Sequence, residues 1–283
     1  MKTYFDCIPC FLRQALNAAR LTTTDINMHE KVMRKVLGRV SEMDLNQPPP
    51  LMGQQIYRII RETTGNSDPY KKIKDKFNTF VLDLYPEFKK KITTSVNPFE
   101  TAVRLAIAGN IIDFGVEAKI NTSTVYQVVN QSLTQKIDGS IKKFKDTVFS
   151  ANKILYLGDN SGEIVFDRLL IEQLPYDKVT FAVRGYPVIN DVTMDDAEAT
   201  GITKLVSVID NGSDAPGTIL DECSDEFKHV FQDADVIISK GQGNYESLSE
   251  SNKNIFFIFK VKCPVVAENT KCAVGSMVIQ NNK

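Results

Sequence analysis

The sequence predicts a protein of the α/β class, with a mainly parallel sheet between two layers of helices and an all-α region in front of it. In the first half of the chain, apolar residues recur at helical spacing. From Lys153 onward, short apolar runs of strand length alternate with helical segments, which is typical of βαβ units. We therefore predict a helical N-terminal subdomain at residues 1–150 and an α/β domain at residues 151–283, with a site between the two.

The helical half is divided by prolines and by helix caps. Helices are expected at residues 9–21, 26–43, 51–63, 124–133 and 139–149. Three consecutive prolines that begin at Pro48 separate the second helix from the third. Pro69 is placed to begin a further helix, and we expect that helix to bend or stop at Pro86.

One helix of this half carries polar residues among its apolar ones. It begins at Asn97 with a cap, a first-turn proline and a capping-box acid, and it is expected to end at Gly115. Asn110 falls on its apolar stripe, and Asp113 lies one turn away on the edge of that stripe. A buried amide or carboxylate is unfavourable without a partner. Two interpretations stay open: the pair bonds to helix ends or loops in the core, or it projects into the site.

In the second half, strands are expected at residues 154–157, 179–183, 205–209, 236–239 and 255–259. Helices are expected between them at residues 163–173, 195–200, 224–231 and 245–249. The first strand stops at Gly158, and the segment DNSGE follows it before the next helix. Such a turn places oxygen ligands and free backbone N–H groups at the carboxyl end of a strand, where open α/β sheets bind their ligands.

Charged and amide side chains recur at or just after the other predicted strand ends. Together with the first turn, these residues are Asp159, Asn160, Arg184, Asp191, Asp210, Asn211, Lys240 and Asn244. Hard oxygen ligands mixed with Arg and Lys suit a divalent metal ion together with a phosphate. Neither a P-loop nor a dinucleotide-binding glycine motif is present in the sequence. The two histidines, His29 and His229, stand in polar helical contexts, which argues against a His-rich zinc site and a Ser-His-Asp hydrolase.

The bulk composition excludes several classes of partner. The chain has 283 residues, 42% of them apolar, and a net charge of −1, so no overall field attracts it to nucleic acid or to a membrane surface. It contains no apolar run of transmembrane length, and its N-terminus lacks the apolar core of a secretory signal. We therefore expect a cytoplasmic protein with no nucleic-acid or membrane partner. The sequence carries no signal for an oligomeric state.

The five cysteines are an odd number in a long chain and indicate reduced thiols. Cys7 and Cys10 form a C-x-x-C pair, but no second pair follows, which argues against a zinc site with four cysteine ligands. A redox or metal role at the helix N-terminus and simple burial of two small residues both stay open.

Several segments together resemble the damage-control phosphatase family, long catalogued as a domain of unknown function (number eighty-nine), and in particular its stand-alone prokaryotic branch. The matching segments are FDCIPC, AIAGNIIDFG, LGDNSGE, RGYPVINDVT, KGQGNYESL, FKVKCPVVAE and VGSMVI, in this order over nearly the whole chain. The resemblance implies a helical N-terminal region against a Rossmann-like three-layer α/β/α domain. It also implies a metal-dependent phosphatase that acts on small phosphorylated metabolites, such as sugar phosphates or damaged cofactors.

Residue roles follow from the same resemblance. Asp159, Asn160 and Asp191 would hold the metal ion, which would be Mn, Mg, Co or Ni. Lys240 would bind or neutralise the phosphate. Asn110 and Asp113 match the family's helix motif facing the same cleft, which favours the second interpretation given above.

We expect catalysis to use these same residues. The catalytic residues would be Asp159, Asp191, Lys240 and Asp113, and the substrate-binding residues would be Asn110, Gly162, Glu163, Arg184 and Asn244. Lys240 and free N–H groups at Gly162 and Glu163 are the candidate hydrogen-bond donors to the phosphate. The attacking group is expected to be a water at the metal, oriented by Asp113 or Asp191, with Asp159 as a covalent nucleophile in the alternative.

Two other functions compete with a phosphatase. One is a carboxyl methyltransferase that uses S-adenosylmethionine, since a Rossmann-like sheet holds that cofactor in other proteins. Such an enzyme requires a glycine-rich loop after the first strand and an acid at the end of the second, whereas this sequence has DNSGE and Arg184 there. The other is a metabolite-binding module without catalysis.

Overall fold

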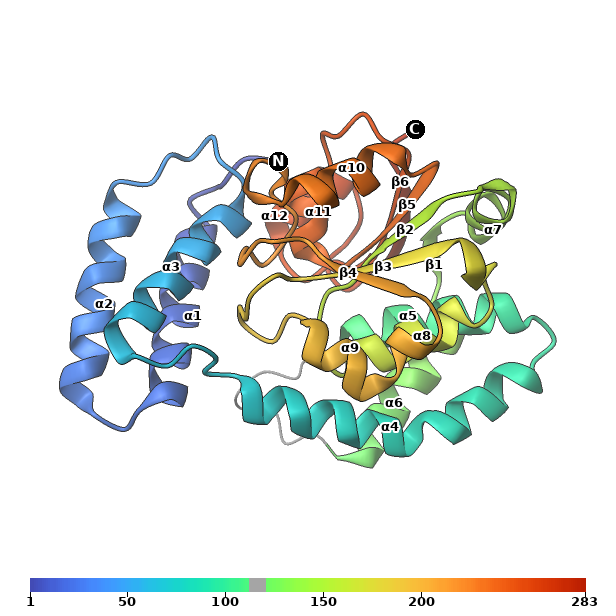
Figure 1. Ribbon diagram of the computed structural model, residues 1–283, viewed down its shortest axis with the longest axis horizontal. Coiled ribbons are helices and arrows are strands. Elements are labelled where there is room, and N and C mark those ends of the chain that lie inside the picture. Colours follow the sequence, from blue (N-terminus) through green and yellow to red (C-terminus); the bar gives the residue numbers. More distant parts are fainter. Residues whose placement is uncertain (112–120) are drawn as a thin grey trace.

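The computed structural model describes residues 1–111 and 121–283 (Figure 1). In this part of the chain the strands form one seven-stranded sheet in the order β1-β7-β6-β5-β2-β3-β4. The strands are β1 (Ile137–Gly139), β2 (Ile154–Leu157), β3 (Val179–Val183), β4 (Ser207–Asp210), β5 (Val236–Lys240), β6 (Ile255–Lys260) and β7 (Met277–Asn281). The five strands from β6 to β4 are parallel, whereas β7 is antiparallel to β6 and parallel to β1. The predicted α/β class with a mainly parallel sheet is confirmed.

Helices cover both faces of the sheet. The helices that follow the bundle in sequence are α4 (Lys71–Thr93), α5 (Pro98–Ile111), α6 (Thr122–Thr134), α7 (Ile141–Ser150), α8 (Glu163–Ile171), α9 (Met194–Thr200), α10 (Asp225–Asp233), α11 (Gln242–Leu248) and α12 (Pro264–Thr270). Helices α4 to α9 share one apolar cluster with the sheet, and α10 to α12 share another. Within β2, Tyr156 belongs to the first cluster and Leu155 to the second, because successive side chains of a strand point to opposite faces. The domain therefore has three layers.

The remaining helices form a small bundle beside the sheet, in blue in Figure 1. They are α1 (Cys7–Thr22), α2 (Ile26–Ser41) and α3 (Pro49–Thr64), and they bury an apolar cluster of their own. Helix α3 packs against loops at the carboxyl ends of the strands: a Cβ on Gly53 would lie 2.8 Å from Pro216, which follows β4. The bundle thus covers the edge of the sheet where the site was predicted.

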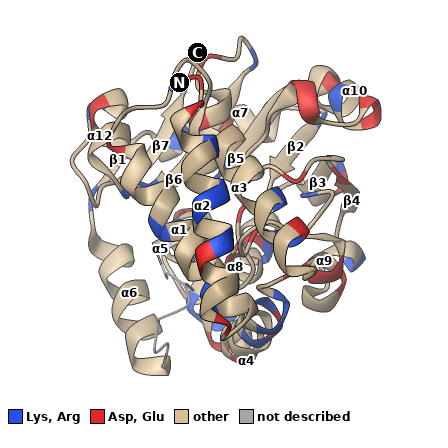
Figure 2. Cartoon of the chain, turned by 90° about the vertical axis from the view of Figure 1, so that its left-hand side faces the viewer, with Lys and Arg blue, Asp and Glu red and all other residues tan. Residues whose placement is uncertain are grey.

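Two surface properties agree with the composition. Basic and acidic residues are both spread over the elements that face the viewer in Figure 2, as expected from a net charge of −1. Over the described residues, the helices are too short or too polar to cross a lipid bilayer.

The structure departs from the predicted elements in two respects and leaves a third prediction untested. Helix α4 continues through Pro86, because the buried residues Phe77, Val81, Phe88 and Ile92 fix it on both sides of the proline. The sequence reasoning missed β1 because it has only three residues, and it missed β7 and α12, which lie beyond the last predicted strand. The helix that begins at Pro98 is described as far as Ile111, so its predicted end and Asp113 lie outside the described residues.

The predicted boundary at residue 150 falls at the end of α7. One apolar cluster contains Phe144 and Val148 of α7 together with Ile154 of β2, so the core continues across that residue. A division of the chain at residue 150 stays a prediction.

Candidate metal and phosphate site

The site lies where β2 and β5 stand side by side, with Leu157 paired to Ser239. From β2 the chain proceeds to β3 and β4 on one side, whereas from β5 it proceeds to β6 on the other. In doubly wound sheets the usual ligand site lies at such a reversal, beyond the carboxyl ends of the two strands.

Glycines allow the two strand-end loops to approach each other closely. Gly241 has a φ of +79°, and a Cβ placed on it would lie 1.9 Å from Oδ2 of Asp159. The Asp159 carboxylate therefore rests against the backbone that follows β5. Gly158 is equally restricted, since its Cβ would lie 2.7 Å from the ring of Phe181.

Asp159 is held by two amides. Nδ2 of Asn110, on α5, donates to Oδ2 of Asp159 and to Oε2 of Glu163, at 3.0 Å each. Nδ2 of Asn160 donates to the same two oxygens, at 2.6 and 3.0 Å. The backbone N–H of Lys260 in turn donates to Oδ1 of Asn110 at 3.2 Å. Helix α5, the turn after β2 and the end of β6 thus meet at these carboxylates.

Asp191 reaches the same place from the loop after β3. Asn160 and Asp191 form an isolated antiparallel bridge, and the N–H of Val192 donates to the carbonyl of Asp159 at 2.9 Å. Nε of Arg184 donates to Oδ2 of Asp191 at 2.8 Å. The three predicted metal ligands therefore lie on adjoining, hydrogen-bonded segments of backbone.

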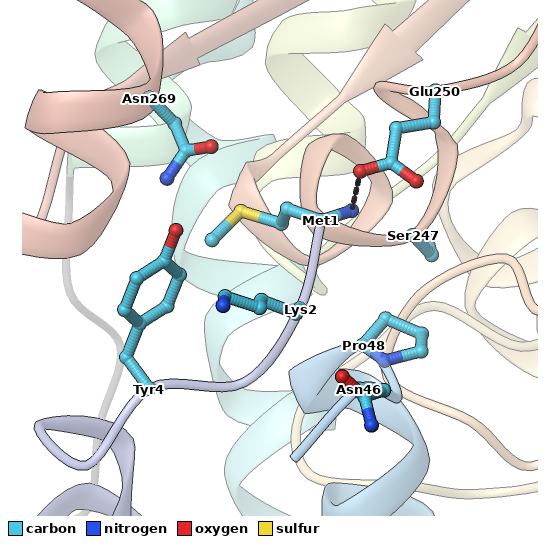
Figure 3. A pocket seen from close by; sticks show the side chains of 8 residues that line it. All are labelled: Met1, Lys2, Tyr4, Asn46, Pro48, Ser247, Glu250 and Asn269. Carbon is cyan, nitrogen blue, oxygen red and sulfur yellow. Dashed lines mark ion pairs between the residues drawn. The ribbon is translucent and has the colours of Figure 1, made fainter.

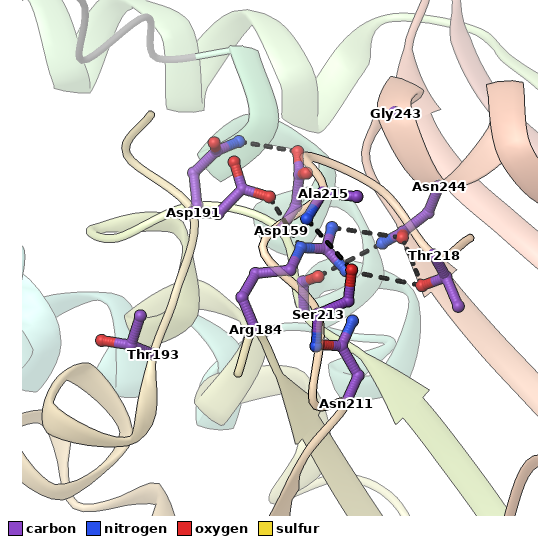
Figure 4. A network of polar contacts seen from close by, with 12 residues as sticks. Asp159, Arg184, Asp191, Thr193, Asn211, Ser213, Ala215, Thr218, Gly243 and Asn244 are labelled. Atoms are coloured by element: carbon purple, nitrogen blue, oxygen red, sulfur yellow. Dashed lines mark hydrogen bonds and ion pairs between the residues drawn. The ribbon is translucent and has the colours of Figure 1, made fainter. Parts of the chain in front are cut away.

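Arg184 is fixed on its other side, as Figure 4 shows. Its Nη2 donates to Oδ1 of Asn244 at 3.2 Å, and the hydroxyl of Thr218 donates to the same oxygen at 2.8 Å. Nδ2 of Asn244 donates to the carbonyls of Lys240 and Gly158 at 2.8 and 3.2 Å. Asn244 consequently ties the guanidinium to both strand ends.

A second group of buried charges, around Lys240, adjoins the first group at Glu163. Lys240 is fully buried, and its Nζ donates to Oε1 of Glu163 at 2.7 Å, to the carbonyl of Ala106 at 3.0 Å and to Asp167. Tyr156 donates to the same oxygen of Asp167 at 2.8 Å. An ammonium group has three protons, so these three acceptors satisfy Lys240.

The site contains more buried negative charge than positive charge. Four buried carboxylates, those of Asp159, Glu163, Asp167 and Asp191, face two buried basic side chains that pair with them, those of Lys240 and Arg184, among the residues described around them. The charge of a further buried base, Lys74, also acts on Asp191, but the ion pair of Lys74 is with another buried acid, Asp196. An uncompensated buried carboxylate is strongly unfavourable. The donor set therefore fits a divalent cation, which would restore neutrality.

The pKa values follow from this imbalance. Burial, together with the charges of Glu163 and Asp191, raises the pKa of Asp159 well above its usual range. Burial also raises the pKa of Asp191, although Arg184 opposes the rise. Burial raises the pKa of Asp167 to about 7 against the effect of Lys240. These carboxylates hold protons more readily than exposed ones do, as expected for a site that lacks positive charge.

The sequence model of the damage-control phosphatase ARMT1-like domain matches residues 3–278 of this chain. The chain belongs to this family. A damage-control phosphatase of Pyrococcus horikoshii is 36% identical over 100% of this chain and 99% of its own length. A damage-control phosphatase of Archaeoglobus fulgidus is 34% identical and covers 96% of each chain. The crystal structure of a DUF89 family protein from P. horikoshii has a TM-score of 0.92 with this structure, at 35% identity and full coverage of both chains.

The predicted site residues that the structure describes, which exclude Asp113, fall into three groups. The first is joined by hydrogen bonds at the ends of β2 and β5 and consists of Asn110, Asp159, Asn160, Glu163, Arg184, Asp191 and Asn244. Lys240 forms the second, because its protons already face protein acceptors. Gly162 forms the third: its N–H donates to Oδ1 of Asn78 at 2.7 Å, so the expected free N–H donor is not there.

Three buried partners of the site were missed by sequence reasoning. Asp167 had a signal, since it is the one acid in the segment IVFDRLL of α8, whose residues are apolar except for Asp167 and Arg168. Asn78, on α4, and Thr218, in the loop after β4, had none, because polar residues in an amphipathic helix or a turn-rich loop are ordinary.

The side-chain hydrogen bonds that the cysteine thiols form among the described residues go to residues outside this network. All five are free thiols. Cys7 is half-buried and Cys10 is exposed, and burial raises the pKa of the Cys7 thiol, opposite to the effect expected of a helix N-terminus. The groups of His, Cys, Asp and Glu in the described residues do not include three already arranged as metal ligands, so a cation would have to draw its ligands together.

The N-terminal segment borders a separate cavity of about 360 Å³, drawn in Figure 3. Met1 enters it with its amino group 3.6 Å from a carboxylate oxygen of Glu250. None of the predicted site residues is among the eight that line it, which are Met1, Lys2, Tyr4, Asn46, Pro48, Ser247, Glu250 and Asn269. This cavity therefore does not compete with the carboxylate cluster as the place of chemistry.

Proposed function

We propose that this chain is a metal-dependent phosphatase that hydrolyses phosphate monoesters of small metabolites, such as sugar phosphates or damaged cofactor intermediates. The relatives described above are named damage-control phosphatases, which supports the reaction class. The single observation that carries the metal dependence is the excess of buried carboxylates over buried cations at the switch point of the sheet.

The cation would be held by Asp159, Asn160 and Asp191. Carboxylate and amide oxygens are the ligands preferred by Mg and Mn, and they also accept Co and Ni. Asn160 would present its amide oxygen to a cation by turning its side chain, since Nδ2 now points at the carboxylates. A divalent ion held there would supply polarisation of a phosphoryl oxygen and a lower pKa for a nearby water.

The other residues of the cluster hold these ligands in place. Asn110 fixes the Asp159 carboxylate through a hydrogen bond, and Lys240 fixes Glu163. We assign Lys240 this holding role in place of the phosphate contact expected from the sequence. Arg184 holds Asp191 and favours its ionised form against the effect of burial, because a guanidinium stabilises the charged form.

Lys262 is a better candidate for the phosphate contact. It is exposed, and its charge partly opposes the rise that burial causes in the pKa of Asp159, so it lies within electrostatic reach of that carboxylate. An exposed ammonium group near a metal site is free to receive a phosphate oxygen. We expect Lys262→Met to raise KM for a phosphorylated substrate about tenfold, while the matched exposed variant Lys204→Met leaves it unchanged.

The attacking group in this proposal is water, which Asp191 would orient. The alternative, Asp159 as a covalent nucleophile, predicts a burst of acid-stable phosphoenzyme in a rapid-quench experiment. A linear time course without a protein-bound phosphate supports the attack by water.

The test uses metal-stripped protein, p-nitrophenyl phosphate and a panel of sugar phosphates, each with Mn, Mg, Co or Ni. We expect phosphate release only after a cation is added, and a loss of at least a hundredfold in Asp159→Asn. Asp195→Asn, an exposed acid in the first turn of α9, is the control and keeps its activity. Absence of phosphate release with every metal and substrate would reject the phosphatase and favour a non-catalytic binding module.

A further inference from the structure

The loop that carries Asp191 is anchored in the α1–α3 bundle. Val188 is only 2% exposed and belongs to the apolar cluster of that bundle, together with Ile56 and Ile60 of α3. Ile189 packs against the same cluster. Nη1 of Arg61, also on α3, donates to the carbonyl of Pro187 at 2.9 Å. Three consecutive residues of this loop, 187–189, are therefore held by a bundle far away in sequence.

The backbone of this loop is strained at one residue. Ile189 has a φ of +46°, in the left-handed region that β-branched residues rarely adopt. The residues on either side fix it there: Val188 is buried in the bundle, and the carbonyl of Asn190 accepts from the N–H of Ser161 at 2.8 Å. Asp191 follows and pairs with Asn160. The strained residue thus connects the anchor in the bundle to the predicted metal ligand.

Helix α3 also holds the neighbouring loop, which supports Arg184. Gln54, Arg58 and Arg61 recur at helical spacing and all bind Asp214, with Gln54 Nε2 and Arg58 Nε at 2.8 and 3.0 Å. Ser213, the residue before Asp214, accepts a hydrogen bond at its carbonyl from the N–H of Gly185 at 3.0 Å, and Gly185 directly follows Arg184. The loop that carries Asp191 and the loop that carries Asp214 therefore both bind to helix α3.

We propose that the α1–α3 bundle is a positioning device for Asp191, in which the packing of Val188 and Ile189 and the bond from Arg61 hold Ile189 in its left-handed conformation and thereby set the affinity for the cation. The proposal rests on the proposed function, because it takes Asp191 as a metal ligand. None of the three is a catalytic residue, since they act through Asp191.

Substitutions at residue 189 separate positioning from simple packing. Ile189→Ala loses the packing and keeps the steric penalty of a positive φ, so the loop relaxes and Asp191 moves. Ile189→Gly loses the same packing, but glycine adopts a positive φ freely and the loop keeps its course. A residue that matters only for packing would make the glycine variant the worse of the two.

The experiment is a titration of metal-stripped protein with Mn²⁺, followed by the electron paramagnetic resonance of the free ion, so that no activity is needed. We expect binding to weaken about tenfold in Ile189→Ala and at most about threefold in Ile189→Gly. Arg61→Met, which loses both the bond to Pro187 and the ion pair with Asp214, should weaken binding as well. Val36→Ala, a buried cavity variant on α2 of the same bundle, is the control for lost bundle stability and binds as the wild type does.

The outcomes distinguish this inference from the function beneath it. If the wild type binds Mn²⁺ and Asp191→Asn does not, while both Ile189 variants bind as the wild type does or weaken equally, the positioning role is rejected and the phosphatase is untouched. If the wild type binds no Mn²⁺, the metal-dependent function and the inference fail together. Thermal melts of each variant show that the measured protein is folded.

Discussion

Removal of the buried ammonium group of Lys240 tests how the site is held together. Lys240 lies at the centre of the second group of buried charges, with both Glu163 and Asp167 in contact with its Nζ. Lys240→Met keeps most of the side-chain volume but leaves two buried carboxylates without their counter-charge. Loss of one partner of a buried ion pair typically destabilises a protein by about 3–5 kcal/mol.

This free energy converts into a shift of the melting temperature. Unfolding entropy is about 2.1 cal/mol/K per residue, so 283 residues give about 0.6 kcal/mol/K. A loss of about 3–5 kcal/mol therefore lowers Tm by about 5–8 °C. The loss should be smaller at low pH, because a protonated carboxyl no longer needs a counter-charge.

The sign of the pH dependence follows from Asp167, whose pKa burial raises to about 7 in the wild type. Its pKa in the unfolded chain is about 3.9, so between these values the folded state binds the extra proton. Stability from this group is thus complete below about pH 4 and is lost as the pH rises to about 7. Without Lys240 the folded pKa rises further, and the loss extends to higher pH.

The assay is differential scanning calorimetry of metal-free protein from pH 5 to pH 8. Lys153→Met is the matched control, because Lys153 also pairs with an aspartate, Asp233, but at the surface, where the effect is much smaller. Lys240→Met with Asp167→Asn should regain part of the lost stability. A Lys240→Met protein that melts with the wild type at pH 8 would refute the reasoning, because the two carboxylates would then need no counter-charge.

Three further predictions concern the cation, the α3 cluster and α4. Mn²⁺ at about a hundred times its Kd should stabilise the folded chain by about 2.7 kcal/mol, or about 4–5 °C in Tm, and Asp159→Asn should abolish the shift; an equal shift in that variant would place the ion elsewhere. Burial raises the pKa of Asp214, but hydrogen bonds from Arg58, Gln54 and Arg61 outweigh this effect and hold the pKa below its usual value. The stability lost in Asp214→Asn, measured by urea titrations, should therefore shrink as the pH falls through the acid range. A difference that stays constant with pH would contradict an ionised Asp214. Pro86→Ala should raise the unfolding free energy by about 1–3 kcal/mol in the same titrations, because α4 already runs through this residue and alanine is the better residue inside a helix. An unchanged or lower value would mean that Pro86 does not destabilise α4.

The fold was predictable because its signals are local. The strands β2 and β3 have the predicted bounds, since each is a short apolar run between turn residues and is buried on both faces. The antiparallel strand β7 has no such pattern: it ends in the half-buried residues Gln280 and Asn281, and its partner β1 has three residues. The strands β1 and β7 are defined by their pairing with residues distant in sequence, and a local sequence pattern does not indicate such pairing.

The site was predictable only in part, for a related reason. Position after a strand placed Asp159, Asn160 and Asp191 among eight candidates, because the ends of parallel strands share one edge, and the family resemblance then singled them out as metal ligands. The same rule pointed to Lys240, but the depth of a side chain is not encoded in its position, and Lys240 ends β5 facing two buried acids of α8. Asn110 shows the opposite case, in which a polar residue on an apolar stripe correctly indicated a contact outside its own helix.

The central claim is that the carboxylates at the ends of β2 and β3 share a divalent cation. Crystals of the wild-type chain grown with Mn²⁺, with diffraction data collected at the manganese edge, test it most directly. The account predicts one strong anomalous peak bounded by oxygens of Asp159, Asn160 and Asp191. A peak at another place, or no peak in protein that still releases phosphate, would contradict it.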